Sequence, residues 1–560
     1  MTGKQPWWQE AVVYEVYPRS FADTTGDGIG DLAGVRSRLP YLADLGVDAI
    51  WLTPFYPSPL ADGGYDVSDY RDVDPRLGTL ADFDALVAEA ADRGIRVIVD
   101  LVPNHCSAGH PAFRRALAAS PGGPERDMFL FRDGRDGGDQ PPNNWQSVFH
   151  GPAWTRVTEP DGRPGQWYLH LFDAGQPDWN WRNPAVAAYF EGVIRFWLDR
   201  GAAGLRIDVA HGIFKDPALA DLTGPPVPHA PTAYQHRPEL HDLYRSWRAI
   251  LDSYAPPGSR TAIGEVWYDS AATLRPYLDG TGLPQVFNFQ LLLARWDAAE
   301  LRRAIDAVEA LAGGDRAPWV IGNHDVPRPV SRYAPAAPGA PTGSGAAHAP
   351  GIPRASRAMP GPGTPELRIG AQRARAAALL LLALPGSAYL YQGEELGLPE
   401  VVDLPPDARA DPTFRRSGGT ALGRDGCRIP LPWAPGGTSF GFSPEGAAPP
   451  WLPQPGYWGE YSAAGQGGDP GSFLNLYRAA LRLRRSHPAL GYGRSGAGSG
   501  LTWLDGPPGL LCFAREPGFV FAANLGPGPA PLPRHGEVLL ASGTVTDGKL
   551  PPDTAVWLAS

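Results

Sequence analysis

Charged side chains recur in separate parts of the 560-residue chain, each time where a short apolar run ends. Arg206 and Asp208 are two positions apart on one such run, so they share a face if the run forms a strand. A guanidinium beside a carboxylate favours the ionised carboxylate, the state that a nucleophile needs. Glu265 is followed by Val266 and Trp267, apolar neighbours that would keep a general acid protonated. One carboxylate thus suits attack on a substrate and the other suits proton donation.

Hydrolysis of a glycosidic bond requires this division of labour between two carboxyl groups, and a separation of roughly 5–5.5 Å gives retention of configuration. A third carboxylate, Asp325, would stabilise positive charge that develops on a sugar ring. His105 and His324 stand at the same kind of run end. Each residue alone is equally compatible with a helix cap, a salt bridge or a structural hydrogen bond. The prediction of a site therefore depends on whether these run ends converge.

They converge if the apolar runs are the strands of one barrel. Helical stretches separate the runs, the first of them Leu32–Leu45, and this alternation indicates parallel pairing in a (β/α)₈ TIM barrel. In that fold the chemistry lies at the carboxyl ends of the strands. The predicted strands are Val12–Tyr17, Ala49–Thr53, Arg96–Val102, Gly204–Val209, Thr261–Trp267, Gln285–Phe289, Trp319–Gly322 and Ala388–Gln392.

Two long gaps and the C-terminal region complete the predicted organisation. Residues 106–183, rich in Pro, Gly and Trp, predict a subdomain inserted after the third strand, so the barrel comprises 1–105 and 184–490. Residues 327–364 are dense in Ala, Pro and Gly, and no structure is predicted for them. Short strand-like runs beyond a Gly/Ser-rich stretch predict a C-terminal antiparallel β-sandwich over 491–560.

Composition excludes several classes of partner. The net charge is −10 and no basic run is present, which argues against nucleic acid or an anionic membrane surface. Three widely spaced cysteines form neither a disulfide framework nor a zinc site and suit a reducing compartment. No signal peptide is visible, and the most apolar run, Ala376–Leu384, is far too short to span a membrane. We therefore expect a cytoplasmic protein, and the sequence leaves its oligomeric state open.

The strand-end segments resemble, in the right order, the four motifs of the α-amylase family of retaining glycoside hydrolases, glycoside hydrolase family 13. A fifth segment, Gln176–Asn180, resembles the QPDLN signature of the oligo-1,6-glucosidase/α-glucosidase branch, with Trp179 where leucine is usual. The resemblance spans about residues 6–490. The matching segments are Asp100–His105, Gly204–Val209, Gly264–Trp267 and Gly322–Asp325, with further matches at Trp7–Phe21, Gly63–Asp66 and Tyr391–Glu395.

The resemblance implies a role for each matching residue. Asp208 matches the nucleophile, Glu265 the acid/base and Asp325 the stabiliser of the transition state. No cofactor takes part in this chemistry. The residues that match the subsite for the non-reducing glucose are Arg206, His105, His324, Tyr65, Asp62 and Arg428. By the resemblance, Tyr65 stacks under that glucose, Asp62 binds its far hydroxyls and Arg428 pairs with the same end of the sugar. A role for the nearby Arg424 is less well defined.

Asp62 and Tyr65 imply a pocket that is closed at one end. We therefore expect exo-action on short α-glucosides of the maltose and isomaltose types. The residue after the nucleophile is associated with linkage preference in this branch, and valine, here Val209, is typical of α-1,6 cleavage. The following Ala210–Gly212 departs from the usual pattern, so the preference for α-1,4 or α-1,6 bonds stays open.

A glycine-rich loop near the N-terminus presents oxygens at alternate positions, as a loop that cages a hard cation does. The resemblance implies a structural Ca²⁺ or Mg²⁺ here. The alternative is an Asp/Gly turn with helix caps. The family usually has asparagine where Thr25 stands. The predicted ligands are Asp23, Thr25, Asp27, the carbonyl of Ile29, and Asp31.

Two alternatives to a hydrolase remain at this stage. A transglucosidase or a sugar isomerase, of the sucrose isomerase or trehalose synthase type, would use the same glycosyl-enzyme intermediate and resolve it with a sugar. A non-catalytic member, like the barrel ectodomains that accompany amino-acid transporters, would lack the carboxylates and carry a membrane helix. The chain has all three carboxylates and no apolar run of that length, which disfavours the second alternative.

Overall fold

The structure is a computed structural model that describes residues 6–224, 229–312, 318–336, 353–490, 500–534 and 536–560. At its centre, eight parallel strands lie in the order β10-β11-β1-β2-β3-β7-β8-β9. A parallel bridge between Asn288 and Trp319 connects the two ends of this order, so the predicted TIM barrel is confirmed. The strands are β1 (Val12–Val16), β2 (Ala49–Leu52), β3 (Arg96–Leu101), β7 (Gly204–Ile207), β8 (Thr261–Gly264), β9 (Gln285–Val286), β10 (Pro318–Val320) and β11 (Ser387–Tyr391).

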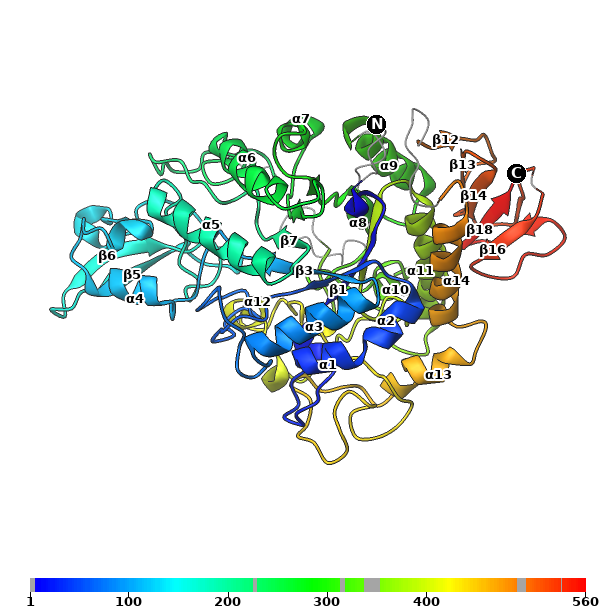
Figure 1. Cartoon of the computed structure of the whole chain (residues 1–560), viewed down its shortest axis with the longest axis horizontal. Helices are drawn as coiled ribbons and strands as arrows, with labels where there is room; N and C mark the ends of the chain where they lie inside the picture. Colours follow the sequence, from blue (N-terminus) through cyan, green and yellow to red (C-terminus); the bar gives the residue numbers. More distant parts are fainter. Residues whose placement is uncertain (1–5, 225–228, 313–317, 337–352, 491–499, 535) are drawn as a thin grey trace.

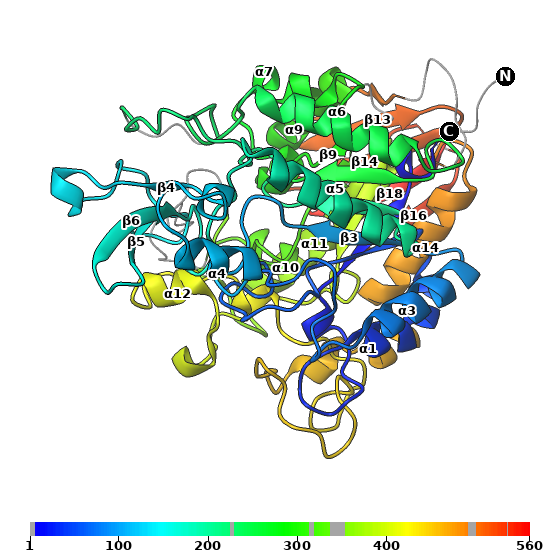
Figure 2. The same cartoon turned by 60° about the vertical axis from the view of Figure 1, so that its left-hand side comes forward.

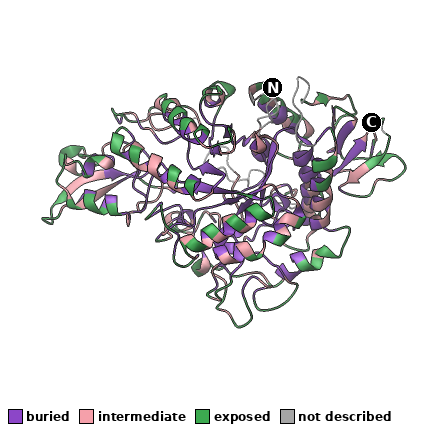
Figure 3. Cartoon of the chain, in the orientation of Figure 1, coloured by how far each residue is buried: buried purple, intermediate pink, exposed green. Residues whose placement is uncertain are grey.

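Successive residues of each strand face opposite sides of the barrel wall. Val12 and Tyr14 of β1 pack in the layer between strands and helices, whereas Val13 packs with Trp51 and Ile98 inside the barrel. Both faces are therefore buried, as in other parallel sheets covered by helices. Figure 3 shows the barrel strands at the centre of the molecule in the colour of buried residues. The same alternation directs Glu15 to the inside.

Helices cover the outside of the barrel (Figures 1 and 2). Several begin at side-chain caps; Thr79, for example, forms a reciprocal capping box with Asp82. The single helix predicted over Leu32–Leu45 is wrong, because Pro40 has no N–H to continue it and the helix restarts after Arg38. The principal helices are α1 (Leu32–Ser37), α2 (Leu39–Leu45), α3 (Leu80–Asp92), α5 (Pro184–Asp199), α6 (Glu239–Asp252), α9 (Ala298–Ala312), α11 (Pro365–Ala383) and α14 (Phe473–Ser486).

Between β3 and α5 the chain leaves the barrel and forms a small antiparallel sheet at the left of Figure 1. Its strands are β4 (Phe131–Arg132), β5 (Trp154–Thr158) and β6 (Pro164–Leu169), and α4 (Pro111–Ala118) precedes them. The loop after β7 packs against this region, since the Trp145 indole N–H donates to the carbonyl of Ala220 at 3.0 Å. The inserted region thus contacts loops at the carboxyl end of the barrel.

The C-terminal antiparallel sheet lies at the right of Figure 1. It contains β12 (Thr502–Trp503), β13 (Leu510–Arg515), β14 (Phe519–Asn524), β18 (Thr554–Ala559) and β16 (Val538–Ala541), in that order. One face packs on α11, where the Trp557 indole donates to the carbonyl of Leu379 at 3.1 Å. A two-stranded sheet, β15 (Ala530–Pro531) and β17 (Lys549–Leu550), accompanies it. The predicted Gly/Ser-rich linker falls mostly on residues 491–499, outside the described residues.

Three further observations bear on the sequence predictions. Among the described residues, none of the helices combines the length and the apolar character needed to cross a bilayer. The three cysteines are free and buried. Much of the segment 327–364 lies outside the described residues, but its start forms the short helix α10 (Pro329–Arg332).

Candidate active site

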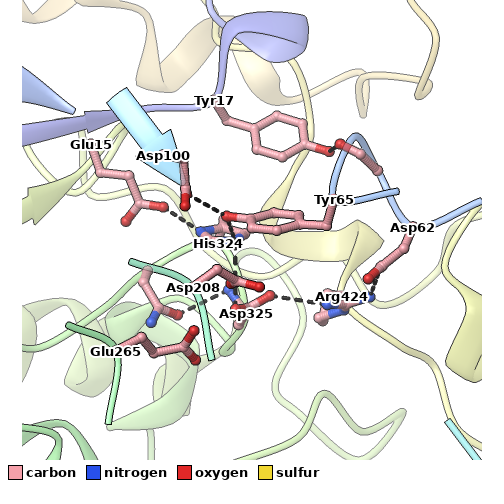
Figure 4. Close-up of polar contacts among 12 residues, drawn as sticks. Glu15, Tyr17, Asp62, Tyr65, Asp100, Asp208, Glu265, His324, Asp325 and Arg424 are labelled. Atoms are coloured by element: carbon pink, nitrogen blue, oxygen red, sulfur yellow. Dashed lines mark hydrogen bonds and ion pairs between the residues drawn. The ribbon is translucent and has the colours of Figure 1, made fainter. Parts of the chain in front are cut away.

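The three carboxylates predicted to carry the chemistry follow three different barrel strands. Asp208 comes directly after β7, Glu265 directly after β8, and Asp325 lies in the loop after β10. Because parallel strands end on one side of a barrel, the three side chains meet there (Figure 4). All three line one cavity of about 530 Å³.

Arg206 connects this group of acids from inside the barrel. Its guanidinium donates to Asp208 at 2.6 Å, to Glu265 at 2.8 Å and to Asp100 at 3.1 Å. Asp100 is the register partner of Arg206 on the neighbouring strand β3. One buried guanidinium therefore serves three buried carboxyl groups.

Burial opposes Arg206 in setting the protonation of this cluster. It raises the pKa of Asp208 well above the usual range, although Arg206 lowers it. Burial likewise raises the pKa of Asp100 to about 7. The sequence predicted only the ionising effect of the arginine, and the structure shows that desolvation is the larger one. The cluster consequently favours holding a proton when no substrate charge is present.

Glu265 is held by donors on both of its oxygens. The Trp267 indole N–H donates to Oε1 at 2.8 Å, and the backbone N–H of Val209 donates to Oε2 at 3.1 Å. Trp267 is thus a polar partner, whereas the sequence suggested only an apolar neighbour. Val209 has a φ of +45°, which is unusual for a β-branched residue and marks local strain. The strained turn after β7 therefore aims a backbone donor at Glu265.

Asp325 lies against three cationic or potentially cationic groups. Arg428 donates to its Oδ1 at 2.9 Å and Arg424 at 3.1 Å, and His324 Nε2 lies 3.4 Å from Oδ2. Burial raises the pKa of Asp325, but these neighbours outweigh it and hold that pKa well below its usual range. Asp325 is therefore ionised, as a stabiliser of positive charge must be.

Tyr65 lines the cavity and stacks on His324 behind it, with ring centroids 5.3 Å apart and planes at 6° (Figure 4). The Tyr65 hydroxyl lies 2.7 Å from His324 Nε2 and donates to Asp100 at 3.0 Å. On its other side His324 Nδ1 contacts Glu15, whose pKa burial raises. Glu15 was not among the residues predicted from the sequence, where its one signal was an acidic residue inside an otherwise apolar strand.

Asp62 lines the same cavity and is held by two partners. Its Oδ1 accepts from Arg424 at 2.6 Å and its Oδ2 from Gln176 at 3.2 Å. Gln176 Nε2 also lies 3.1 Å from His105 Nε2. Arg424, whose role the sequence left undefined, bridges Asp62, Asp325 and Asp411.

The predicted site residues divide into two layers. Asp62, Tyr65, His105, Val209 and the three carboxylates line the cavity. Arg206, His324 and Arg428 lie behind this lining and are at most 2% exposed. They hold the lining side chains by direct hydrogen bonds. The structure thus brings all these predicted residues together, and assigns the second layer to positioning.

The predicted cation loop is arranged as a hydrogen-bonded turn. Both oxygens of Asp23 accept backbone N–H groups of the loop, and Asp31 caps α1 by accepting from Gly34 at 2.6 Å. Asp27 accepts from the backbone N–H of Ile29 at 2.8 Å. Within the described ranges, no three His, Cys, Asp or Glu side chains gather closely enough to hold a metal ion. The arrangement fits the alternative of a capped turn, and a cation here stays a prediction.

A chelator tests the cation prediction. If Ca²⁺ stabilises the loop, EDTA lowers the melting temperature by several degrees, because a ligand that binds only the folded state adds to its stability. Asp27→Ala is a matched variant, since Asp27 is exposed and alanine removes one predicted ligand at the cost of one hydrogen bond from the backbone N–H of Ile29. The variant should melt lower and no longer respond to EDTA. Equal melting with and without EDTA in the parent protein would contradict a bound cation.

Comparison with known proteins shows the family to which the chain belongs. The chain matches the model of the alpha-amylase catalytic domain over residues 15–338 and 364–493, more than half of its length. The chain belongs to the α-amylase family. As a family member with α-glucosidase relatives, it is a glycoside hydrolase.

Individual family members narrow the resemblance to one branch. A probable alpha-glucosidase of Rhizobium meliloti (strain 1021) is 38% identical over 536 residues, which cover 91% of this chain and 87% of that protein. An oligo-1,6-glucosidase of Parageobacillus thermoglucosidasius is 32% identical, covering 87% and 85%. The crystal structure of the alpha-glucosyl transfer enzyme XgtA is 36% identical, with a TM-score of 0.83 and full coverage of both chains. These α-amylase family members include enzymes named for hydrolysis and for transfer.

Proposed function

We propose that this α-amylase family member is a retaining, exo-acting α-glucosidase that releases glucose from the non-reducing end of short α-glucosides. The observation that carries the proposal is the convergence of Asp208, Glu265 and Asp325 on one cavity that is also lined by the Asp62–Arg424 ion pair. A cavity of about 530 Å³ falls within the range for small-molecule ligands, which suits a short oligosaccharide.

The proposed first step transfers the glucosyl group to the enzyme. A carboxylate oxygen of Asp208 forms a bond to the anomeric carbon while the bond to the leaving oxygen breaks. Glu265 donates its proton to that oxygen, so the leaving sugar departs neutral. Asp325, ionised beside Arg424 and Arg428, stabilises the positive charge that develops on the ring. Positive charge at the anomeric carbon also favours the ionised form of Asp208.

Water completes the proposed cycle. Glu265, now a carboxylate, takes a proton from water as the water oxygen attacks the anomeric carbon, and the bond to Asp208 breaks. Two displacements at the same carbon restore its configuration. Arg206 donates hydrogen bonds to Asp208 and to Glu265 and so holds both side chains in position in both steps.

The Asp62–Arg424 ion pair in the cavity lining supports the proposed exo-action. Asp62 is 3% exposed and is held by both Arg424 and Gln176, so its carboxylate is rigidly placed. Such a carboxylate accepts hydrogen bonds from terminal sugar hydroxyls. A chain that continued beyond that sugar would have to displace the ion pair, so a non-reducing end fits best.

Transglucosylation or isomerisation is the second candidate, favoured by the similarity to a solved α-glucosyl transfer enzyme. A panel of maltose, isomaltose, sucrose, trehalose and starch with product identification by chromatography separates the candidates. Hydrolysis yields glucose as the main product from maltose or isomaltose, and starch is a poor substrate. Longer or rearranged sugars as the main products would instead show that a sugar resolves the intermediate. Turnover of starch as fast as maltose would contradict exo-action on short substrates.

The cellular setting is also a proposal. We infer that the enzyme works in a reducing compartment, the cytoplasm, with a small α-glucoside as its partner. Support comes from the three free, buried cysteines and from a net charge of −10 without a basic run.

A further inference from the structure

A second, smaller cavity of about 210 Å³ opens beside the catalytic one. Three separate parts of the chain line it: Val148 and His150 of the inserted region, 354–357 before α11, and Thr413 of the short helix α12 (Pro412–Arg416) with the loop 420–423 that follows it. Val148, His150 and Arg354 line both cavities, so the two are neighbours with a shared wall. Its volume is below the range of about 300–1,000 Å³ for whole small-molecule ligands, which suits one substituent of a larger substrate. We call it the arginine pocket.

Arg354 faces this pocket with unused donors. Among the described residues it makes no hydrogen bond and no ion pair, and its Nε is buried without a partner. The charges that act on it are those of Arg424, Asp325 and Asp411. Both carboxylates are already engaged, because Arg424 donates to Asp411 at 2.5 Å and to Asp325 at 3.1 Å. The planar guanidinium of Arg354 therefore remains available to a ligand.

The rest of the lining agrees with an anionic ligand. Arg357 also lines the pocket and forms no ion pair within the described part of the chain, and none of the described lining residues is acidic. Thr413 is 5% exposed, and its hydroxyl is buried without a hydrogen-bond partner among the described residues. Two guanidinium groups and a hydroxyl match the acceptor oxygens of a phosphate or a carboxylate.

We propose that the arginine pocket binds an anionic group, phosphate or carboxylate, on the leaving part of the substrate. This rests on the proposed α-glucosidase function and specifies its substrate class. The anion belongs to the leaving part because the proposed site for the glucose lies among Asp62, Asp208 and Asp325, and the charge of the ionised Asp325 would repel an anion there. The enzyme thus prefers α-glucosides whose aglycone carries a negative charge.

Matched substrate pairs test this preference. The first pair is maltose and maltose phosphorylated at C6 of its reducing glucose. The second is 2-O-α-glucosylglycerol and 2-O-α-glucosylglycerate, which differ by a carboxylate. We expect kcat/KM to be roughly 10- to 100-fold higher for the anionic member of at least one pair, as charge-assisted hydrogen bonds allow. The pair that shows the larger ratio identifies the anion.

Substitutions then locate the effect. Arg354→Gln should lower the ratio of anionic to neutral kcat/KM by roughly 10-fold or more, and Arg354→Lys, which keeps the charge, should retain most of it. Arg163→Gln is the control, since Arg163 is exposed in the turn between β5 and β6 and should leave the ratio unchanged. A parent enzyme with no preference in either pair, or a preference that survives in Arg354→Gln, would overturn the proposal.

Binding measured without turnover separates this proposal from the proposed function. Calorimetry on Asp208→Asn compares maltose with its phosphorylated form, and the double variant Asp208→Asn/Arg354→Gln shows whether Arg354 carries the difference. If the enzyme hydrolyses neutral glucosides and shows no preference for anionic ones, the proposed function stands and only the anion-binding role of the arginine pocket is rejected. Tighter, Arg354-dependent binding of phosphorylated maltose to an enzyme that hydrolyses no glucoside rejects hydrolysis and supports the pocket. The absence of both turnover and differential binding rejects both.

Discussion

Asp208→Asn is expected to lower kcat for α-glucoside hydrolysis by about 10⁴- to 10⁶-fold, the scale seen when an enzyme loses its nucleophile. An amide oxygen cannot form the glycosyl-enzyme bond. It can still accept from Arg206, which donates to Asp208 at 2.6 Å, so the architecture of the cluster is retained. The loss should be equally severe on maltose and on p-nitrophenyl α-glucoside, because both need the nucleophile.

The stability of Asp208→Asn distinguishes a catalytic defect from a folding defect. Burial raises the pKa of Asp208 in the folded protein, which means that folding disfavours its ionised form. At pH 7 the ionised group is therefore a cost to the folded state, and a neutral amide relieves it. The melting temperature should be unchanged or higher. Asp161→Asn, an exposed control, should keep full activity, and activity retained by Asp208→Asn would exclude it as the nucleophile.

Glu265→Gln is expected to reduce kcat on maltose by about 10²- to 10⁴-fold, the range attributed to general acid–base catalysis. The substituted amide cannot protonate the sugar oxygen that leaves. A p-nitrophenolate ion leaves without a proton, so the glucosylation step with p-nitrophenyl α-glucoside should lose much less. The measurement is the pre-steady-state release of p-nitrophenol, compared with single-turnover cleavage of maltose.

This dependence on the leaving group is what separates Glu265 from Asp208. Equal losses on both substrates in Glu265→Gln would contradict its role as proton donor. Glu89→Gln is a matched control, because Glu89 is a surface residue of α3 that pairs only with exposed arginines. The amide that Glu265→Gln introduces still offers an acceptor to Arg206 or Trp267, so a gross rearrangement of the site is not expected.

Local sequence patterns were sufficient for most of the fold. Each of the eight predicted barrel strands overlaps a strand of the structure, because short β-branched runs between helical stretches are a local signal. The error at Leu32–Leu45 was also local. Apolar spacing continued through that segment, but Pro40 interrupts the backbone hydrogen bonds of the helix.

The three carboxylates proposed to be catalytic were predicted by a combination of strand-end position and resemblance to family motifs. Other residues of the site escaped that approach. Glu15 makes its contact with His324 across 309 positions of sequence, and Arg424 reaches Asp62 across 362. No periodicity or spacing encodes such pairs. Arg354 was missed for the same reason, since it lies in a stretch for which the sequence predicts no structure.

Residue types and their order along the chain were thus enough to predict the barrel, the inserted region, the C-terminal sheet and the identity of the three acids. The protonation of the site carboxyl groups and the accessibility of the site side chains could be judged only from the tertiary structure. Desolvation at Asp208, the separation of lining from supporting residues, and the lack of a partner for Arg354 among the described residues all depend on which distant groups surround each side chain. Those surroundings arise only when the barrel closes, because electrostatic energies depend on distances in space and on burial rather than on separation along the chain.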